Sequence, residues 1–332
     1  LLLAGSAYAQ GSPDILRAHD HVDLLQVAEP PQEQVKLPPG GMTLSAEERA
    51  NLHRNSGDTP LHLPSLDALS GDATEPLRYR RIELFAPNST IRLIGPSGTS
   101  LVRPGRRVYY VATNETTGVG LAVDPDSGNI NGIASRSGEK YEISSTDGTQ
   151  VTLAAVEPLP DGSDACDTRV GNQPHFDLER ATSDSPRSLS GAIAGSSISY
   201  EAVVAIDADN EWMAGKGNDP ATAMRFIADL FLAMNVLYER DMETRLLVGD
   251  VVLRTTADPY SVASGRPAQM DEFARYWRVN MGSVDRDFAM MFSGRDISPY
   301  YYSGIAWLDQ YCQDGRVGFG GITVGSYSFN AI

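Results

Sequence analysis

The chain contains 332 residues, of which 41% are hydrophobic, and its 43 acidic and 27 basic side chains give a formal net charge of −16. This length suits two domains of ordinary size, and the hydrophobic share is enough for packed cores, which excludes wholesale disorder. The acidic excess argues against nucleic acid and anionic membrane surfaces as partners, because both need basic patches. Two cysteines exclude a disulfide-rich scaffold. We predict no membrane span, since no apolar run approaches about 20 residues.

The first nine residues have the features of the end of a secretory signal peptide. Residues 1–6 are apolar and small, and Ala7, Tyr8 and Ala9 form the A-x-A pattern of a processing site. The alternative is an ordinary disordered N-terminus. The signal-peptide interpretation predicts a secreted or periplasmic protein whose sequence, as given, begins inside an open reading frame.

Residues 10–75 are polar and interrupted by prolines, so we expect a loose segment there. One short helix is expected within residues 45–52. Ser45 would be its N-cap, and Glu48 stands three residues later, as in a capping box.

Residues 76–160 are predicted to form a small antiparallel β domain of about seven strands. Apolar residues alternate with period two, and turn signals such as Asp126-Ser127-Gly128 separate the alternating runs. Residues 161–197 are polar again and are predicted to form a linker, which contains Cys166.

Residues 198–332 show a different pattern, which predicts a mostly parallel sheet with crossover helices. Residues 202–206 form a continuous apolar run, as in a strand buried on both faces. A helix follows, with Asp219 as the expected N-cap and Pro220 at its first position. A second helix is expected to end at Gly282.

The printed sequence contains none of the common catalytic motifs. It has no H-E-x-x-H zinc motif, no G-x-S-x-G elbow and no phosphate-binding glycine loop. All five histidines precede residue 198: His19, His21, His53, His62 and His175. Asp207, Asp209 and Glu211 are carboxylates close in sequence, and the interpretation we favour is a solvated acidic loop.

Four segments of the last region, in order, resemble the reprolysin-like (adamalysin) branch of the metzincin zinc peptidases, in its bacterial secreted form. They are residues 200–209, 234–241, 287–295 and 303–308. The resemblance implies an α/β metzincin-like upper lobe, with a mostly parallel twisted sheet, crossover helices and an antiparallel edge strand. It also implies that the β domain of residues 76–160 is a pro-domain.

The implied function is that of a secreted zinc endopeptidase precursor, which hydrolyses protein or peptide substrates with a zinc-activated water. In the family the zinc-binding helix and its catalytic Glu follow this lobe. We therefore expect every catalytic residue beyond Ile332, and the fragment as given should be inactive. The alternative is a non-catalytic exported binding or adhesion protein with a β-rich module.

The resemblance also suggests an inhibitory role for the pro-domain. In many relatives a pro-segment cysteine ligates the zinc, and Cys166 is the candidate for that ligand here. The alternatives are a disulfide with Cys312 or a free thiol.

Two further sites follow from the resemblance. Asp287 matches an Asp that binds calcium in some relatives, but calcium needs about six or more oxygen ligands and only this residue is matched, so we favour a plain surface carboxylate, with a calcium site as the alternative. The segment around residues 320–329 is interpreted as the antiparallel edge strand, along which an extended peptide could bind. Its candidate substrate-binding residues are Gly321, Ile322, Thr323, Val324 and Gly325. The alternative is a covered edge without a ligand role.

Overall fold

The computed structural model describes residues 41–55, 59–70, 76–145, 147–156, 166–169, 198–261, 266–295, 304–307 and 318–324. The chain divides into two compact units, Leu1–Lys36 and Leu37–Ile332, and all described residues belong to the second. The predicted signal peptide therefore lies outside the described residues and stays a prediction.

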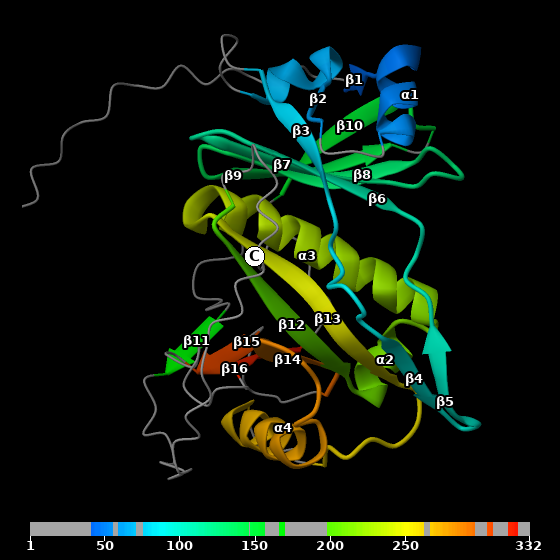
Figure 1. Ribbon diagram of the computed structural model, residues 1–332, viewed down its shortest axis with the longest axis vertical. Helices are drawn as coiled ribbons and strands as arrows, with labels where there is room; N and C mark the ends of the chain where they lie inside the picture. The colour runs from blue at the N-terminus through cyan, green and yellow to red at the C-terminus, as the bar shows by residue number, and fades with distance from the viewer. Residues whose placement is uncertain are drawn as a thin grey trace, which may run out of the picture. The chain divides into compact units, whose positions relative to one another are not determined.

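The first sheet has eight strands in the order β1-β10-β9-β8-β7-β6-β3-β2, and all its neighbours pair antiparallel (Figure 1). Gly128 and Gly138 have φ values of 74° and 85° in the turns around β8, which explains the glycines there. The strands are β1 (Met42–Thr43), β2 (Leu61–His62), β3 (Arg78–Ile82), β6 (Val108–Thr113), β7 (Thr117–Val123), β8 (Ile130–Arg136), β9 (Glu139–Ser145) and β10 (Gln150–Ala155).

The expectation of a loose segment is wrong for residues 41–55 and 59–70. They form α1 (Ala46–Arg54), the 3-10 helix η1 (Pro64–Leu69) and two short strands. The capping box of α1 is confirmed, with both Ser45–Glu48 hydrogen bonds present. Buried leucines anchor this segment by packing on the outer face of the first sheet. Their irregular spacing between the prolines gave no helical or strand periodicity in the sequence. They are Leu44, Leu52, Leu63, Leu66 and Leu69.

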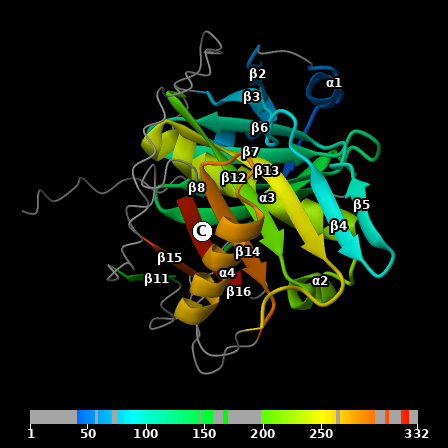
Figure 2. The same cartoon turned by 60° about the horizontal axis from the view of Figure 1, so that its bottom comes forward.

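The second sheet also has eight strands, in the order β11-β15-β16-β14-β12-β13-β4-β5 (Figure 2). The pairs β11–β15, β16–β14, β14–β12, β12–β13 and β13–β4 are parallel, whereas β15–β16 and β4–β5 are antiparallel. The strands are β4 (Ile91–Gly95), β5 (Gly98–Val102), β11 (Cys166–Arg169), β12 (Tyr200–Ala208), β13 (Thr244–Arg254), β14 (Phe288–Ser293), β15 (Gly304–Trp307) and β16 (Gly318–Val324).

Two expectations about strands are wrong. The hairpin β4–β5 was expected in the first β domain, yet it extends the second sheet beside β13. The segment expected to be an antiparallel edge contains β16, which is parallel to β14 and has β15 on its other side. Both errors have one cause: alternation predicts a strand but not its neighbour, because the neighbour is distant in sequence.

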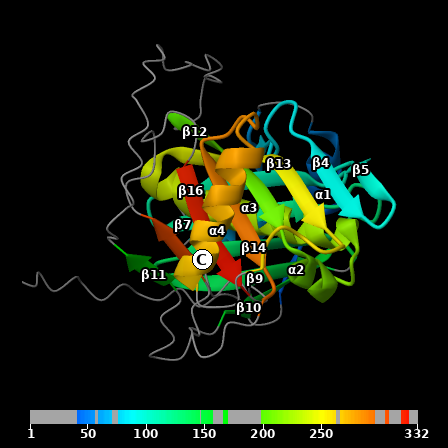
Figure 3. The ribbon, with the colours of Figure 1, turned by 90° about the horizontal axis from the view of Figure 1, so that it is seen from below.

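Three helices pack on the second sheet: α2 (Asn210–Gly215), α3 (Pro220–Met242) and α4 (Arg266–Asn280). Asp219 caps α3 and Pro220 begins it, as predicted. α3 lies between the two sheets, and α4 covers the opposite face of the second sheet (Figures 1 and 3). Successive residues of β12 divide between these faces: Val204 and Ile206 point to the α3 side, and Ala205 to the α4 side.

The helix α3 is long and apolar enough to cross a membrane by length and composition, in contrast to the sequence-based expectation. In the structure 56% of that apolar window is buried inside the protein. The helix packs on β13 on one side and on β6, β7 and β8 on the other. Burial on two faces accounts for its apolar composition without a membrane.

Glycines in β7 let the first sheet approach α3 closely. A Cβ atom added at Gly118 would lie 2.5 Å from Val236, and one at Gly120 would lie 2.8 Å from Val236 and 2.9 Å from Leu232. Side chains at these positions would therefore push the sheet and the helix apart.

Replacing Glu48 should destabilise the packed N-terminal segment. Its carboxylate accepts hydrogen bonds from the Ser45 N–H (2.7 Å), the Ser65 N–H (2.8 Å) and the Ser65 hydroxyl (2.6 Å). We expect Glu48→Ala to lower the free energy of unfolding by about 1–3 kcal/mol in urea titrations, because these donors lose their acceptor. The exposed neighbour Glu47 provides the matched control, and an equal effect of Glu47→Ala would contradict the assignment.

The same carboxylate should make stability depend on pH. Burial alone would raise the pKa of Glu48, but the hydrogen bonds from Ser65 and Ser45 outweigh burial and hold that pKa below its ordinary value. When the pKa of a carboxyl group is lower in the folded state than in the unfolded state, its ionised form stabilises the fold. This contribution is complete above the pKa of the unfolded state and is lost as the pH falls through the pKa of the folded state. The stability gap between the wild type and Glu48→Gln should therefore shrink below about pH 4, as measured by urea titrations at several pH values. A gap that stays constant from pH 7 to pH 3 would contradict this reasoning.

Candidate functional site

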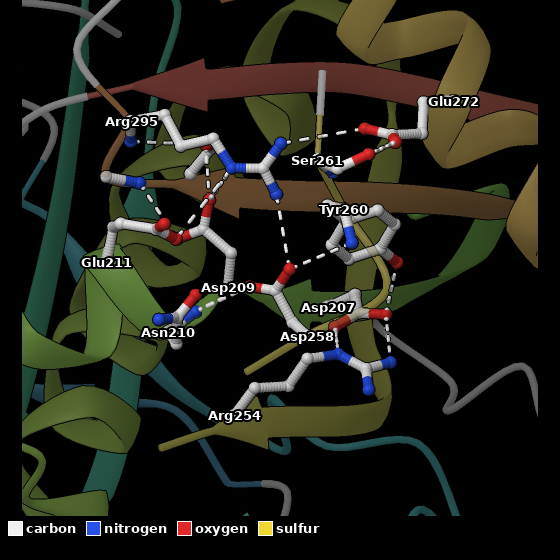
Figure 4. Close-up of polar contacts among 12 residues, drawn as sticks. Asp207, Asp209, Asn210, Glu211, Arg254, Asp258, Tyr260, Ser261, Glu272 and Arg295 are labelled. Atoms are coloured by element: carbon white, nitrogen blue, oxygen red, sulfur yellow. Dashed lines mark hydrogen bonds and ion pairs between the residues drawn. The ribbon is translucent and has the colours of Figure 1, made fainter. Parts of the chain in front are cut away.

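Charged side chains gather at the carboxyl ends of three adjacent parallel strands, β13, β12 and β14. Asp209 directly follows β12, Asp258 lies in the loop after β13, and Arg295 follows β14 (Figure 4). Parallel strands end at the same edge of a sheet, and ligand sites of open α/β sheets lie at that edge. This edge is therefore where a functional site is expected.

Three carboxylates form the centre of the cluster. Asp209, Glu211 and Asp258 each offer an oxygen atom, and these atoms lie within 4.8 Å of one another. Like charges this close repel, so the arrangement needs a cation or protons to be stable.

Arg295 supplies a positive charge to the cluster. Its Nε lies 3.7 Å from Asp209 and 3.8 Å from Glu211, and its terminal nitrogens lie 3.3 Å from Asp258 and 3.6 Å from Glu272. The Arg295 side chain is only 9% exposed, so little solvent screens these pairs. The guanidinium thus balances charge that the carboxylates would otherwise leave uncompensated.

Asp209 is the most deeply held member. It is fully buried, caps α2 by accepting from the Trp212 N–H (2.7 Å), and accepts from the Gly294 N–H (2.9 Å) and the Ser293 hydroxyl. Burial raises the pKa of Asp209 despite these hydrogen bonds. A Cβ atom at Gly294 would lie 2.4 Å from the Glu211 and Trp212 backbone, so glycine is required for the loop after β14 to pass this close.

A second buried network lies beside the cluster and holds Asp207. Arg254 donates two hydrogen bonds to its carboxylate, at 2.7 and 2.8 Å. The Tyr260 hydroxyl (2.6 Å) and the Trp277 indole N–H (3.0 Å) donate to the same carboxylate. Burial, together with the charge of Asp207, raises the pKa of Tyr260, which keeps its hydroxyl a donor.

The interpretation of Asp207, Asp209 and Glu211 as a solvated loop is therefore wrong for the first two. Both aspartates are fully buried, whereas the Glu211 side chain is 44% exposed. Their arginine partners are 47 and 86 positions away in the chain and could not be paired with them from the sequence. The one sequence signal was the position of both aspartates at the end of an apolar strand.

The donor set does not fit zinc. All three clustered ligand atoms are carboxylate oxygens, and Arg295 already supplies positive charge, whereas zinc sites in proteins generally include histidine nitrogens or cysteine sulfurs. Of the histidines, the structure describes His53 and His62; His53 lies in α1, and His62 contacts Asp67 at 2.9 Å. Within the described ranges, no histidine joins an acidic cluster.

The residues predicted from the resemblance are placed elsewhere. Cys166 begins β11 and is in register with Gly304 of β15, and Cys312 lies outside the described residues. The Asp287 carboxylate accepts from the Val203 N–H at 2.7 Å and is not part of the acidic cluster, so its calcium role stays a prediction.

The candidate substrate-binding residues are split. Gly321, Ile322, Thr323 and Val324 lie in β16, whose described neighbours are β14 and β15, while Gly325 lies outside the described residues. β15 pairs with β16 at Ile322 and Thr323, so the proposed edge position is wrong for these two residues.

Comparison with known protein families finds a match in the C-terminal part of the chain. Residues 224–331 match the family described as Metallo-peptidase family M12B Reprolysin-like, which confirms the resemblance to reprolysin-like metzincins. No curated protein matches the chain.

Solved structures show only distant similarity. The crystal structure of metalloproteinase-II from Bacteroides fragilis has 9% identity and a TM-score of 0.34, and covers 75% of this chain and 72% of that one. A chain from the structure of a chaperone-substrate complex has 12% identity and a TM-score of 0.31 over 60% of this chain. The match spans 28% of that chain. TM-scores this low carry no information about shared function.

Removing the Arg295 charge should destabilise the protein strongly at neutral pH. We expect Arg295→Met to cost about 3–5 kcal/mol in urea titrations at pH 7, because it leaves buried carboxylates without their cation. Burial already raises the pKa of Asp209, and loss of the guanidinium would raise it further. The variant should therefore lose stability as the pH increases, and the cost of the substitution should be smaller near pH 4.

Arg106 is the control for this variant, because its side chain is 78% exposed and its pairing with Asp126 is solvated. Arg106→Met should change the free energy of unfolding by no more than about 0.5 kcal/mol. Equal stability of the two variants at pH 7 would show that Arg295 does not balance the cluster.

Proposed function

We propose that this chain provides the pro-segment and the upper lobe of a secreted zinc-dependent endopeptidase. The observation that carries the proposal is the reprolysin-like family match over residues 224–331, a range that begins in α3 and extends past β16. The family implies a protein or peptide substrate. The A-x-A pattern at residues 7–9 supports export.

Zinc would have to be bound by residues outside the described part of the chain, since the acidic cluster does not fit it. When bound, zinc would supply a nucleophilic water at neutral pH. The contribution of this lobe would be to hold the substrate. The charged networks at the ends of β12, β13 and β14 would keep the strand ends in fixed positions rather than take part in the reaction.

We propose β15 rather than β16 as the substrate-binding strand. β15 pairs antiparallel with β16 on one side and carries β11 on the other. An extended peptide can bind by adding to the free edge of a sheet. If β11 left, the side of β15 that it now covers would become such an edge.

On this proposal β11 is an inhibitory strand of the pro-segment. It pairs with β15 over four residues in parallel register, from Cys166–Gly304 to Arg169–Trp307. A segment in this place would block strand addition by a substrate. The position of Cys166 at the start of the same strand makes a thiolate ligand to the zinc a second way to hold the enzyme inactive.

Activity before processing tests this proposal. The longest form of the protein that its gene encodes should cleave casein after processing, and a zinc chelator should abolish the cleavage. Before any cut in the pro-segment, Cys166→Ala should cleave casein faster than the uncut wild type, because water regains the zinc position that the thiolate held, but more slowly than the processed protein, because β11 still covers β15.

Thr168→Ala is the matched control, since it alters β11 two residues away and keeps the thiol. It should stay latent until processing. Latency of Cys166→Ala would show that the strand alone blocks the site. No chelator-sensitive cleavage by the processed protein would refute the enzyme and favour an exported binding protein.

A further inference from the structure

We propose that residues 41–156 act as a non-covalent subunit, which stays bound to residues 198–332 after the chain between them is cut. The partner surface on the second part is the edge of β13 that faces away from β12, together with the face of α3 that points away from the second sheet. The association rests on the contacts between the two parts, whereas its consequence for latency rests on the proposed function.

Backbone pairing is the first element of this interface. The Val248 N–H donates to the Leu84 carbonyl at 2.7 Å, and the Ala86 N–H donates to the Val248 carbonyl at 2.8 Å. Further along, Val251 donates to Thr90 at 2.8 Å and Thr255 to Ile94 at 2.9 Å. The N-terminal part thus pairs with the edge of β13 from residue 248 to the end of the strand.

A side chain of β13 fixes the register of this pairing. The Asp250 carboxylate accepts from the Thr90 N–H at 2.8 Å and lies 3.6 Å from the Arg92 guanidinium. Both contacts join the two parts of the chain. They favour one alignment of β4 along β13 over a shift by two residues.

A shared hydrophobic core is the second element. Residues of the N-terminal part are buried in one cluster with β12, α3 and β13, so no layer of polar side chains separates them. The contributors from the N-terminal part are Ile82, Leu84, Ile91, Tyr109, Val111 and Ala122.

Buried ion pairs are the third element. Glu239 of α3 is 1% exposed and receives hydrogen bonds from Arg80 of β3 at 2.7 Å and from Arg245 of β13 at 2.6 Å. Arg107 lies 2.7 Å from Asp229 of α3. Burial raises the pKa of Asp229, and the Arg107 charge opposes that shift. Breaking such pairs while they are buried is costly, which should slow separation.

Separation would expose the apolar second face of α3 and an open strand edge at once. Both are features that folded proteins keep covered. If the protein is a latent peptidase, one cut in residues 157–197 would therefore leave the pro-segment in place. Activation would need a further cut within residues 41–156 or its unfolding.

The test uses the full chain with a recognition site for a specific endoprotease inserted between residues 180 and 181. After complete cutting, shown by denaturing electrophoresis, both pieces should elute together at the mass of the intact chain in size-exclusion chromatography with light scattering. Separate elution of two folded pieces at micromolar concentration would overturn the proposal. The readout involves no peptidase activity, so it is independent of the proposed function.

Two pairs of variants test the interface itself. Gly120→Val inserts a side chain between β7 and α3, whereas Gly105→Val is the control because nothing lies within 4 Å of its added Cβ atom. We expect Gly120→Val to weaken the association of the cut pieces at least tenfold, measured as the dissociation constant in dilution series. Equal constants for the two variants would show that the face of α3 is not the contact.

If Gly120→Val does not fold before cutting, a second pair of variants tests the interface: alanine replaces one buried and one exposed leucine. Leu84→Ala, at 1% exposure in the shared core, should weaken the association by about 30-fold. Leu101→Ala, at 75% exposure in β5, should leave it unchanged. Equal dissociation constants for this pair would overturn the shared-core interface.

Discussion

The structure depends on one helix that is buried on two sides. α3 carries 11 buried residues, and it packs on β13 on one side and on β6, β7 and β8 on the other. Each sheet has to come close enough to exclude water, and the first sheet does so with Gly118, Gly120 and Ala122 along β7. Small residues on one partner and large ones on the other give the interdigitated packing that a dry core requires. Every residue of β7 is consequently buried, because its other face contacts the segment anchored by α1 and η1.

The same constraint explains why two regions that differ in sequence pattern form one core. A lobe made only of residues 198–332 would leave the second face of α3 and the edge of β13 without cover. The N-terminal part supplies both, through the first sheet and through β4. The five strands β13, β12, β14, β16 and β15 all come from residues after 198. Strands that precede residue 198 pair with both outer members of this set: β4 lies beside β13, and β11 lies beside β15. Strand edges need partners or protection, and here the chain provides them from its own earlier part.

The sequence predicted helices, caps and single strands well, but it predicted poorly which strands pair with one another. The capping box at Ser45, the cap at Asp219 and the buried run of β12 depend on residues close together in the chain, and all three are present. The assignment of β4–β5 to the first β domain failed because a period of two is the same in either sheet. The prediction that β16 is an edge strand was wrong for a related reason: the order of strands in a sheet depends on pairing between segments that are distant in sequence.

The charged networks show the same limit for the site. Asp207 and Asp209 stand two residues apart at the end of β12, but each contacts an arginine from a different neighbouring strand: Arg254 is the last residue of β13, and Arg295 follows β14. Such ion pairs add little net stability, since desolvation offsets their attraction, but a wrong partner would leave a buried charge unpaired. Their effect is to fix the three strand ends relative to one another. A substrate-binding strand at the far side of this sheet needs such a fixed base, because strand addition requires backbone groups already in position. The acidic cluster that resembles a metal site therefore serves the proposed peptidase best as a support, in which Arg295 supplies part of the positive charge that a cation would otherwise have to provide.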